Sequence, residues 1–230
     1  MTQTPFYTKL KQRGKIIISG TDKITFLQSL ISNDVTLLDQ QECVYSCLLT
    51  PQGKFLYDFF LTETKDDALL LDCEGGERLQ SFAKMLSMYK LRADVTIDAE
   101  DNIDVYAIIG TEHGTKDPRH LDMGYRSFEK PEGLDEKPFE EWDKHRISLT
   151  IPDGSRDMIP NKSTLSEGNI DKLNGLSYEK GCYIGQELTA RMHYRGLAKK
   201  HLQTVKLNAL PEKAELRSSC ADIGIALVRI

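Results

Sequence analysis

Residues 180–191 have the sequence KGCYIGQELTAR, and the prediction of fold and function starts from this run. An apolar side chain recurs at every fourth position, which predicts one buried face of a helix. These side chains are Ile184, Leu188 and Met192. Glu187 and Arg191 have the favourable order for an ion pair one turn apart, worth about 0.2–0.5 kcal/mol. Arg195 followed by Gly196 predicts the end of the helix.

The lone cysteine of this run, Cys182, would lie at the N-terminal end of that helix. Unpaired backbone N–H groups and the helix dipole favour an anion there, including a thiolate. Lys180 adds a positive charge, and Gly181 and Gly185 allow close approach of a ligand or another backbone. Two interpretations stay open. Cys182 is either a small buried residue in a turn, as free cysteines usually are, or a thiol that faces a ligand.

Extended through residues 192–196 (MHYRG), the run resembles the motif that defines the YgfZ family. That family is related to the tetrahydrofolate-dependent T-protein of the glycine cleavage system, and its mitochondrial homologues serve iron–sulfur protein maturation. The resemblance therefore implies an α+β, aminomethyltransferase-like folate-binding fold, with a link to tRNA modification. It covers most of residues 15–206 and is sharpest over residues 178–200.

The composition is that of a folded protein with a hydrophobic core. The chain has 230 residues, of which 40% are hydrophobic and 28% are charged. No stretch approaches ~20 apolar residues, so no transmembrane helix is predicted. The polar residues 1–14 lack the apolar region of a secretory signal. We expect a monomeric cytoplasmic protein that does not bind membranes, and a processed organellar protein is the open alternative.

The cysteines are predicted to be reduced, because their number is odd, their spacing is wide and no export signal is present. They are Cys43, Cys47, Cys73, Cys182 and Cys220. The first two fall on one face of a predicted strand, which is more typical of a core than of ligands. The sequence has no Cys-x-x-Cys pair and no spaced histidine set, so no metal site is predicted.

The net charge of −5 hides an asymmetry along the chain. Residues 98–143 contain fourteen acidic and five basic side chains, whereas residues 180–206 contain six basic side chains and one acidic side chain. The basic stretch coincides with the motif. It predicts either an anionic ligand or acidic partner near the motif, or simply a solvated positive face. Direct nucleic-acid binding is not expected, because the acidic remainder would repel phosphates.

Hydrophobic periodicity predicts the secondary structure. Strands are predicted at residues 15–19, 43–50, 55–61, 68–73, 93–97, 105–109 and 201–207, and helices at 24–31, 77–91 and 139–149. Pro51-Gln52-Gly53 predicts a hairpin turn. Residues 111–138 are predicted to be surface loops with one short strand near Leu121, and residues 155–167 a long functional or mobile loop. Helices next to hairpin-connected strands predict an α+β domain.

The resemblance also implies the division of the chain. Residues 1–200 would be the folate-binding region, built from ferredoxin-like β/α modules. We divide it into two intertwined subdomains, residues 1–42 with 111–200 and residues 43–110. Residues 201–230 would be an abbreviated C-terminal β-barrel segment, because about thirty residues follow the motif helix.

Asp58 is the one acid within the apolar run FLYDFFL, residues 55–61. Burying an acid is costly unless it is paired or hydrogen-bonded, so Asp58 is a candidate functional residue. The alternative is that it points outward from an edge strand. The segment from Pro51 to Asp58 also resembles the Pro-x-Gly-(Arg/Lys)…Asp segment of the family. In the T-protein relatives, an acid in this region faces the folate and its one-carbon unit.

The resemblance implies further site residues. Asn33 and Asp34 match an Asn-Asp-Val turn beside the folate cavity, although helix-end capping would also explain them. Glu167 matches only weakly, since the usual preceding proline is absent. The implied folate-binding set is Asn33, Asp34, Asp58, Glu167, Lys180, Gln186, Glu187, Arg191 and Arg195. The implied catalytic residues are Asp58 and the thiol of Cys182.

Three functions follow from these observations. The leading hypothesis is a tetrahydrofolate-binding factor that assists assembly or repair of iron–sulfur clusters, with the assembly machinery and client iron–sulfur enzymes as partners. The second is a tetrahydrofolate-dependent aminomethyltransferase, which needs an acid such as Asp58 near the folate nitrogen. The third is a non-catalytic module that recruits a partner through residues 180–206. Whether the protein turns over a substrate stays open.

Overall fold

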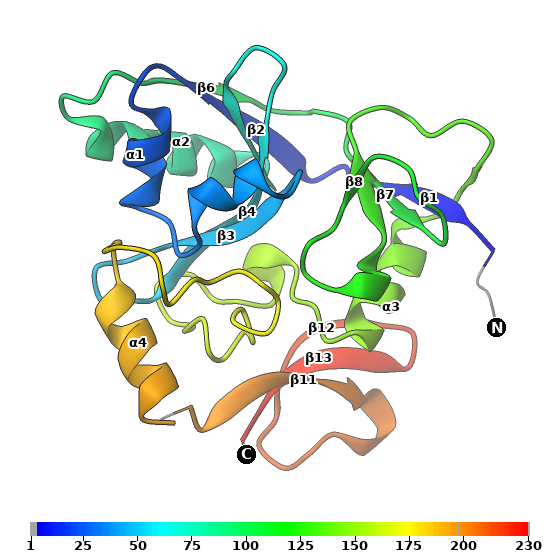
Figure 1. Cartoon of the computed structure of the whole chain (residues 1–230). Coiled ribbons are helices and arrows are strands. Elements are labelled where there is room, and N and C mark those ends of the chain that lie inside the picture. The colour runs from blue at the N-terminus through cyan, green and yellow to red at the C-terminus, as the bar shows by residue number, and fades with distance from the viewer. Residues whose placement is uncertain (1–3, 197, 230) are drawn as a thin grey trace.

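Three β-sheets organise the part of the chain that the computed structural model describes, residues 4–196 and 198–229 (Figure 1). Two sheets have five strands and the third has three. Helix α2 (Glu77–Lys90) packs on the first sheet, whereas α3 (Phe139–Ser148) contacts strands of the other two. Because helices and mainly antiparallel strands occupy separate layers, the predicted α+β class is confirmed.

The first sheet is antiparallel and has the strand order β3-β4-β5-β2-β6. Its strands are β2 (Arg13–Ser19), β3 (Val44–Leu49), β4 (Phe55–Glu63), β5 (Leu69–Glu74) and β6 (Thr96–Glu100). One face is covered by α1 (Lys23–Gln28), α2 and the 3₁₀ helix η1 (Val35–Asp39). Side chains of β4 alternate between the two faces: the Phe59 ring lies 5.4 Å from the Phe82 ring of α2, whereas Phe60 points into the central core.

The second sheet joins the N-terminus to segments about a hundred residues later. Its strand order is β10-β1-β7-β9-β8, and only the β1–β10 pair is parallel. Its strands are β1 (Phe6–Lys9), β7 (Tyr106–Ile109), β8 (Thr115–Lys116), β9 (Tyr125–Ser127) and β10 (Asp135–Glu136). A 3₁₀ helix, η2 (Leu121–Met123), lies between β8 and β9.

The third sheet is antiparallel, has the order β11-β13-β12 and follows the motif helix. Its strands are β11 (Lys200–Lys206), β12 (Glu215–Cys220) and β13 (Ile223–Arg229). The motif helix is α4 (Gln186–Tyr194), and two 3₁₀ helices, η3 (Gly154–Arg156) and η4 (Leu207–Ala209), complete the fold. The irregular segment 155–167 contributes buried Met158 and Leu165, so part of it lies in the core.

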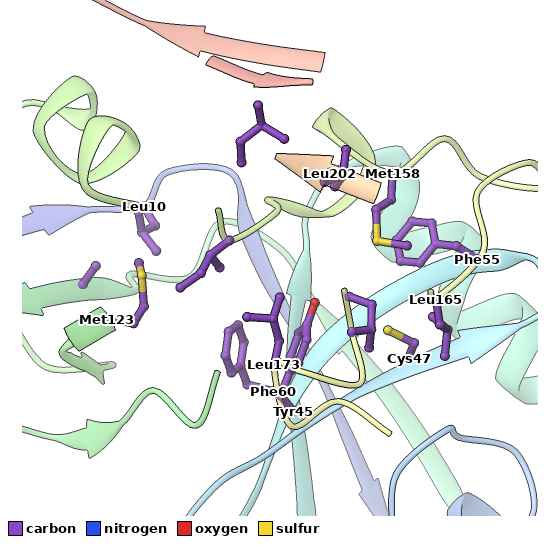
Figure 2. Packing of buried hydrophobic residues seen from close by; sticks show 14 of the residues in the cluster. Leu10, Tyr45, Cys47, Phe55, Phe60, Met123, Met158, Leu165, Leu173 and Leu202 are labelled. Atoms are coloured by element: carbon purple, nitrogen blue, oxygen red, sulfur yellow. The ribbon is translucent and has the colours of Figure 1, made fainter. Parts of the chain in front are cut away.

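One hydrophobic core lies where these parts meet (Figure 2). It takes Tyr45 and Phe60 from the first sheet, Leu10 from the end of β1 and Leu202 from β11. Because side chains of all three sheets share this cluster, the sheets pack against one another through one continuous set of contacts.

A buried arginine also connects elements around this core. Arg146 of α3 is fully buried and donates to the carboxylates of Asp143 and Asp157 and to the Ile151 carbonyl. It donates to Ser218 of β12 as well. These contacts satisfy the buried guanidinium and hold α3, the segment after η3 and the third sheet together.

Most predicted elements are present, but several differ: the strand predicted at residues 93–97 lies at 96–100, and residues 111–138 contain three short strands. The short strand predicted near Leu121 is wrong, because that position begins η2 and the strands lie on either side of it. Strand β1 was not predicted, since its partners β7 and β10 are distant in sequence. The division of residues 1–42 from 43–110 stays a prediction, and β2 pairs across its boundary with β5 and β6.

Candidate functional site

A cleft of about 740 Å³ opens between the first two sheets. It is lined by residues of β3, by β8 and the loop after it, and by residues 174–179. Its wall includes Asn33, Tyr45, Lys116, Asp117, Asn174 and Tyr178. The volume falls within the range of small-ligand sites, about 300–1,000 Å³.

Asn33 is buried in the wall of this cleft. Its side-chain amide donates to the carbonyls of Tyr45 and Asn174, both at 2.8 Å, and its Oδ1 accepts from the Asp34 N–H at 2.9 Å. The amide therefore holds the wall together, and its bonding capacity is largely used within the protein.

Asp34 caps the helix η1. Its Oδ1 accepts hydrogen bonds from the N–H and hydroxyl of Thr36 and from Gln28, at 2.7–2.9 Å. Partial burial opposes ionisation, but these hydrogen bonds outweigh it and lower the pKa of Asp34. The carboxylate of Asp34 thus has a local structural role, as one of the two interpretations expected.

Asp58 lies on the core-facing side of β4 and is only 6% exposed. The hydroxyl of Tyr45 donates to its Oδ2 at 2.9 Å. Burial raises the pKa of Asp58, although the nearby guanidinium groups of Arg13 and Arg119 oppose the shift. Tyr45 lines the cleft and Asp58 does not, so Tyr45 is the side chain that connects them.

Buried arginines surround Tyr45 and Asp58. Arg119 donates to both carboxylate oxygens of Asp117, at 3.0 and 2.7 Å, and its guanidinium lies over the ring of Tyr45. Asp72 accepts from Arg13 and Arg126. Burial alone would raise the pKa of Asp72, but these two cations hold it below its usual value. The buried carboxylates of Asp72 and Asp117 are therefore each paired with a buried arginine next to Asp58.

Lys180 is anchored to the same wall as Asn33. Its ammonium donates to the carbonyls of Ile31 at 2.8 Å and Asn33 at 2.7 Å, and it lies 5.2 Å from the centre of the Tyr183 ring. Burial lowers the pKa of Lys180 to about 8, and Asp34 opposes this shift. The Lys180 ammonium, predicted to support the thiol, is thus half-buried and hydrogen-bonded to two backbone carbonyls.

Cys182 is exposed and lies in residues 181–183, which form neither helix nor strand. The prediction that it lies at the helix N-terminus is wrong, because α4 begins at Gln186. Gly185 precedes the helix with a φ of +82°, and a Cβ there would lie 2.5 Å from the Thr50 carbonyl and 2.9 Å from the Cα of Gly53. This glycine contact seats α4 on the β3–β4 turn, a long-range constraint that leaves the thiol before the helix.

The charged side chains of α4 do not belong to the cleft lining. The Glu187–Arg191 ion pair is present as predicted, and Gly196 ends the helix after Arg195 with a φ of +58°. Among the described residues that line the cleft, neither Arg191 nor Arg195 occurs. Gln186 accepts a hydrogen bond from the Tyr183 N–H at 3.2 Å and so shapes the thiol loop.

Glu167 lies outside the cleft wall. Its carboxylate accepts from the Thr164 N–H at 2.8 Å, and the Thr164 hydroxyl accepts from the Glu167 N–H at 3.3 Å. This reciprocal pair has the hydrogen-bond pattern of a capping box, here at the start of the turns at residues 165–170. The structure therefore brings Asn33, Lys180 and, through Tyr45, Asp58 around one wall, but leaves Glu167, Glu187, Arg191 and Arg195 apart from it.

Two groups near the cleft were not predicted. Tyr178 lines the cleft and stacks on His193 of α4, with ring centres 3.9 Å apart, and Tyr194 packs against His193. Asp117 also lines the cleft, and its partner Arg119 is buried behind it. Asp117 and Arg119 are two residues apart in the sequence, which is the one local sign of their pairing, whereas the Tyr178–His193 stack is a tertiary contact with no local signal.

Comparisons with known proteins place this chain in a family. A family model for the GCVT N-terminal domain matches residues 8–112. The human protein named "Iron-sulfur cluster assembly factor IBA57, mitochondrial" is 30% identical over 239 residues, which cover 88% of this chain and 67% of that protein. The chain belongs to the IBA57 family. The IBA57 protein of Mus musculus is 32% identical over 86% of this chain, and the homologue of Mycosarcoma maydis is 30% identical over 84%.

The chain spans only part of some IBA57 relatives, 65% of the mouse protein and 55% of the Mycosarcoma maydis protein. The names of these relatives call them mitochondrial, so the expectation of a cytoplasmic protein is contradicted. In the part of the chain that the structure describes, no helix is long and apolar enough to cross a membrane.

The fold of this IBA57 family member resembles that of the T-protein, as predicted. The crystal structure of glycine cleavage system aminomethyltransferase T from Bartonella henselae matches 99% of this chain and 79% of its own, with a TM-score of 0.74. The two sequences are 12% identical over the match, so the likeness establishes the aminomethyltransferase-like fold and nothing about activity.

Proposed function

We propose that this chain is an iron–sulfur cluster assembly or repair factor that binds a tetrahydrofolate-type ligand in the cleft and uses Cys182 as a functional thiol. The proposal includes a mitochondrial setting, the YgfZ-type motif at residues 180–187, and iron–sulfur assembly proteins and client enzymes as partners. The observation that carries it is the placement of an exposed thiol three residues after Glu179, which lines a cleft of ligand size.

The cleft residues fit the chemistry of a reduced folate. An amino-pyrimidinone ring presents donors and acceptors, and the carboxylates of Glu42 and Glu179 in the cleft lining can accept from its amino group. Lys116 and His120 lie in the same lining and can pair with the glutamate carboxylates of the ligand. Leu37, Leu121 and Leu176 supply apolar contacts for the rings.

Calorimetry tests this ligand directly. The protein should bind tetrahydrofolate, and Lys116→Met together with His120→Ala should weaken binding, because the variant lacks the Lys116 ammonium and the His120 ring as partners for the glutamate carboxylates. A matched variant, Lys199→Met, removes an exposed lysine that does not line the cleft and should bind normally. No heat of binding at millimolar folate would remove folate from the proposal.

A folate-dependent aminomethyltransferase is the second candidate, favoured by the buried acid Asp58. That reaction requires an acid at the folate nitrogen, but the phenol of Tyr45 stands between Asp58 and the cleft. A substrate would have to displace Tyr45 first, so we favour binding without one-carbon transfer. Turnover of an aminomethyl donor with tetrahydrofolate, lost in Asp58→Asn, would reverse this preference.

A further inference from the structure

Lys180 makes a charged anchor between two parts of the site. Its ammonium spans from the motif to the turn after α1, where it donates to the carbonyls of Ile31 and Asn33. A primary ammonium has three N–H bonds, and the ring of Tyr183 lies on its remaining side at 5.2 Å. The side chain is thus held from three directions.

One end of this anchor belongs to the cleft wall. The Asn33 amide donates to the carbonyls of Tyr45 and Asn174, which both line the cleft. Ser32 strengthens the same wall: its hydroxyl donates to the Gly175 carbonyl at 2.7 Å, and its carbonyl accepts from the Ser177 N–H at 3.1 Å. A ligand that shifts this wall therefore moves the acceptors of Lys180.

The other end of the anchor belongs to the thiol loop. The Ser177 hydroxyl accepts from the N–H of Lys180 at 3.2 Å, and Tyr183 is only 9% exposed and packs in the core. Gly181 and Cys182 lie between these two fixed points and are both exposed. The Cys182 loop therefore begins directly at the residue whose ammonium binds the two wall carbonyls.

We propose that Lys180 is a positioning residue that couples the cleft wall to the Cys182 loop, so that occupation of the cleft changes the reactivity of the thiol. In the held state Lys180 binds the carbonyls of Ile31 and Asn33, and in the released state it does not. A ligand that binds one state more tightly shifts the population toward that state. By linkage, modification of the thiol then changes the affinity for the ligand. The identity of the ligand rests on the proposed function. The connection from the cleft wall through Lys180 to the Cys182 loop does not depend on which ligand binds.

A double-mutant cycle tests the link without any ligand. In a Cys220→Ser background the other three cysteines besides Cys182 are buried, so alkylation by iodoacetamide reports Cys182. Rates are measured at several pH values until they reach a plateau, and the plateau rates are compared, because they report how accessible the thiol is in the loop. Asn33→Ser removes the wall hydrogen bonds and should change the plateau rate in the Lys180 background by at least about twofold, but not in Lys180→Met.

Matched variants complete the test. Lys180→Arg keeps a cation that can reach the carbonyls and should retain the coupling, whereas Lys199→Met should leave the cycle unchanged. Equal effects of Asn33→Ser in the parent background and in the Lys180→Met background would overturn the proposal.

Tetrahydrofolate provides a second readout that needs no wall mutation. Saturating folate should change the plateau alkylation rate of the parent and of Lys180→Arg, but not of Lys180→Met. The same change in all three would contradict the coupling. If calorimetry detects no folate binding, the proposed ligand fails and the double-mutant cycle alone decides the coupling.

Discussion

Asp58 holds a buried carboxyl group against the hydroxyl of Tyr45, next to Arg13 and Arg119. Its position within an apolar strand identified it from the sequence, because an acid there must be paired or hydrogen-bonded. Its partners could not be predicted, since Arg13 and Arg119 come from distant segments. The same is true of Lys180, whose two acceptors lie almost 150 residues earlier.

The raised pKa of Asp58 predicts a pH dependence of stability. Between the ordinary value of about 3.9 and the raised folded value, the folded state binds more protons than the unfolded state, so Asp58 makes stability fall as pH rises through this window. Asp58→Asn keeps an acceptor for Tyr45 and should be at least as stable as the parent at pH 7. Urea unfolding from pH 4 to pH 7 measures this, and parallel curves for the two proteins would contradict it.

At the scale of elements, periodicity predicted the strands and helices that have a clear hydrophobic face. Helix α2 was predicted to within one residue, and the β3–β4 hairpin forms around Gly53. The start of α4 was wrong, because the contact of Gly185 with Gly53 and Thr50 sets it. Such contacts join positions far apart in sequence, so local periodicity does not contain them.

Gly185→Ala should unseat α4 from the hairpin. The new Cβ would lie 2.5 Å from the Thr50 carbonyl at a backbone φ of +82°. We expect a loss of about 1–3 kcal/mol in the free energy of unfolding, because both strain and overlap oppose the residue. Gly181→Ala in the same motif has no heavy atom within 4 Å of its Cβ and should change stability by less than about 0.5 kcal/mol. Equal effects in chemical denaturation would count against this role.

Arg146 should contribute strongly to the free energy of unfolding, because it connects α3 with the third sheet. Arg146→Met leaves the buried carboxylates of Asp143 and Asp157 without this cation and should cost about 3–5 kcal/mol. The exposed partner in the Glu187–Arg191 pair provides the comparison, because Arg191→Met should cost less than about 1 kcal/mol. Urea midpoints of the two variants measure the difference, and similar midpoints would show that the buried pairs contribute little.

At the scale of the whole molecule, the three sheets share a central core, a second cluster lies under α1 and α2, and a cleft lies beside β3 and β8. The α+β class and the aminomethyltransferase-like fold could be predicted from hairpins, helix spacing and the motif. The second sheet could not, because β1 pairs with strands near the ends of a long, loop-rich stretch. Glu179 lines the cleft and the exposed Cys182 follows it by three residues, an arrangement that the proposed function requires.

The most direct test of this function is the activity of an iron–sulfur enzyme in cells that lack their own IBA57 family member. Expression of this chain should restore that activity, and Asp58→Asn should restore it equally. Cys182→Ala, at the same protein level and with unchanged thermal unfolding, should fail because it lacks the exposed thiol. Full restoration by Cys182→Ala would contradict the account.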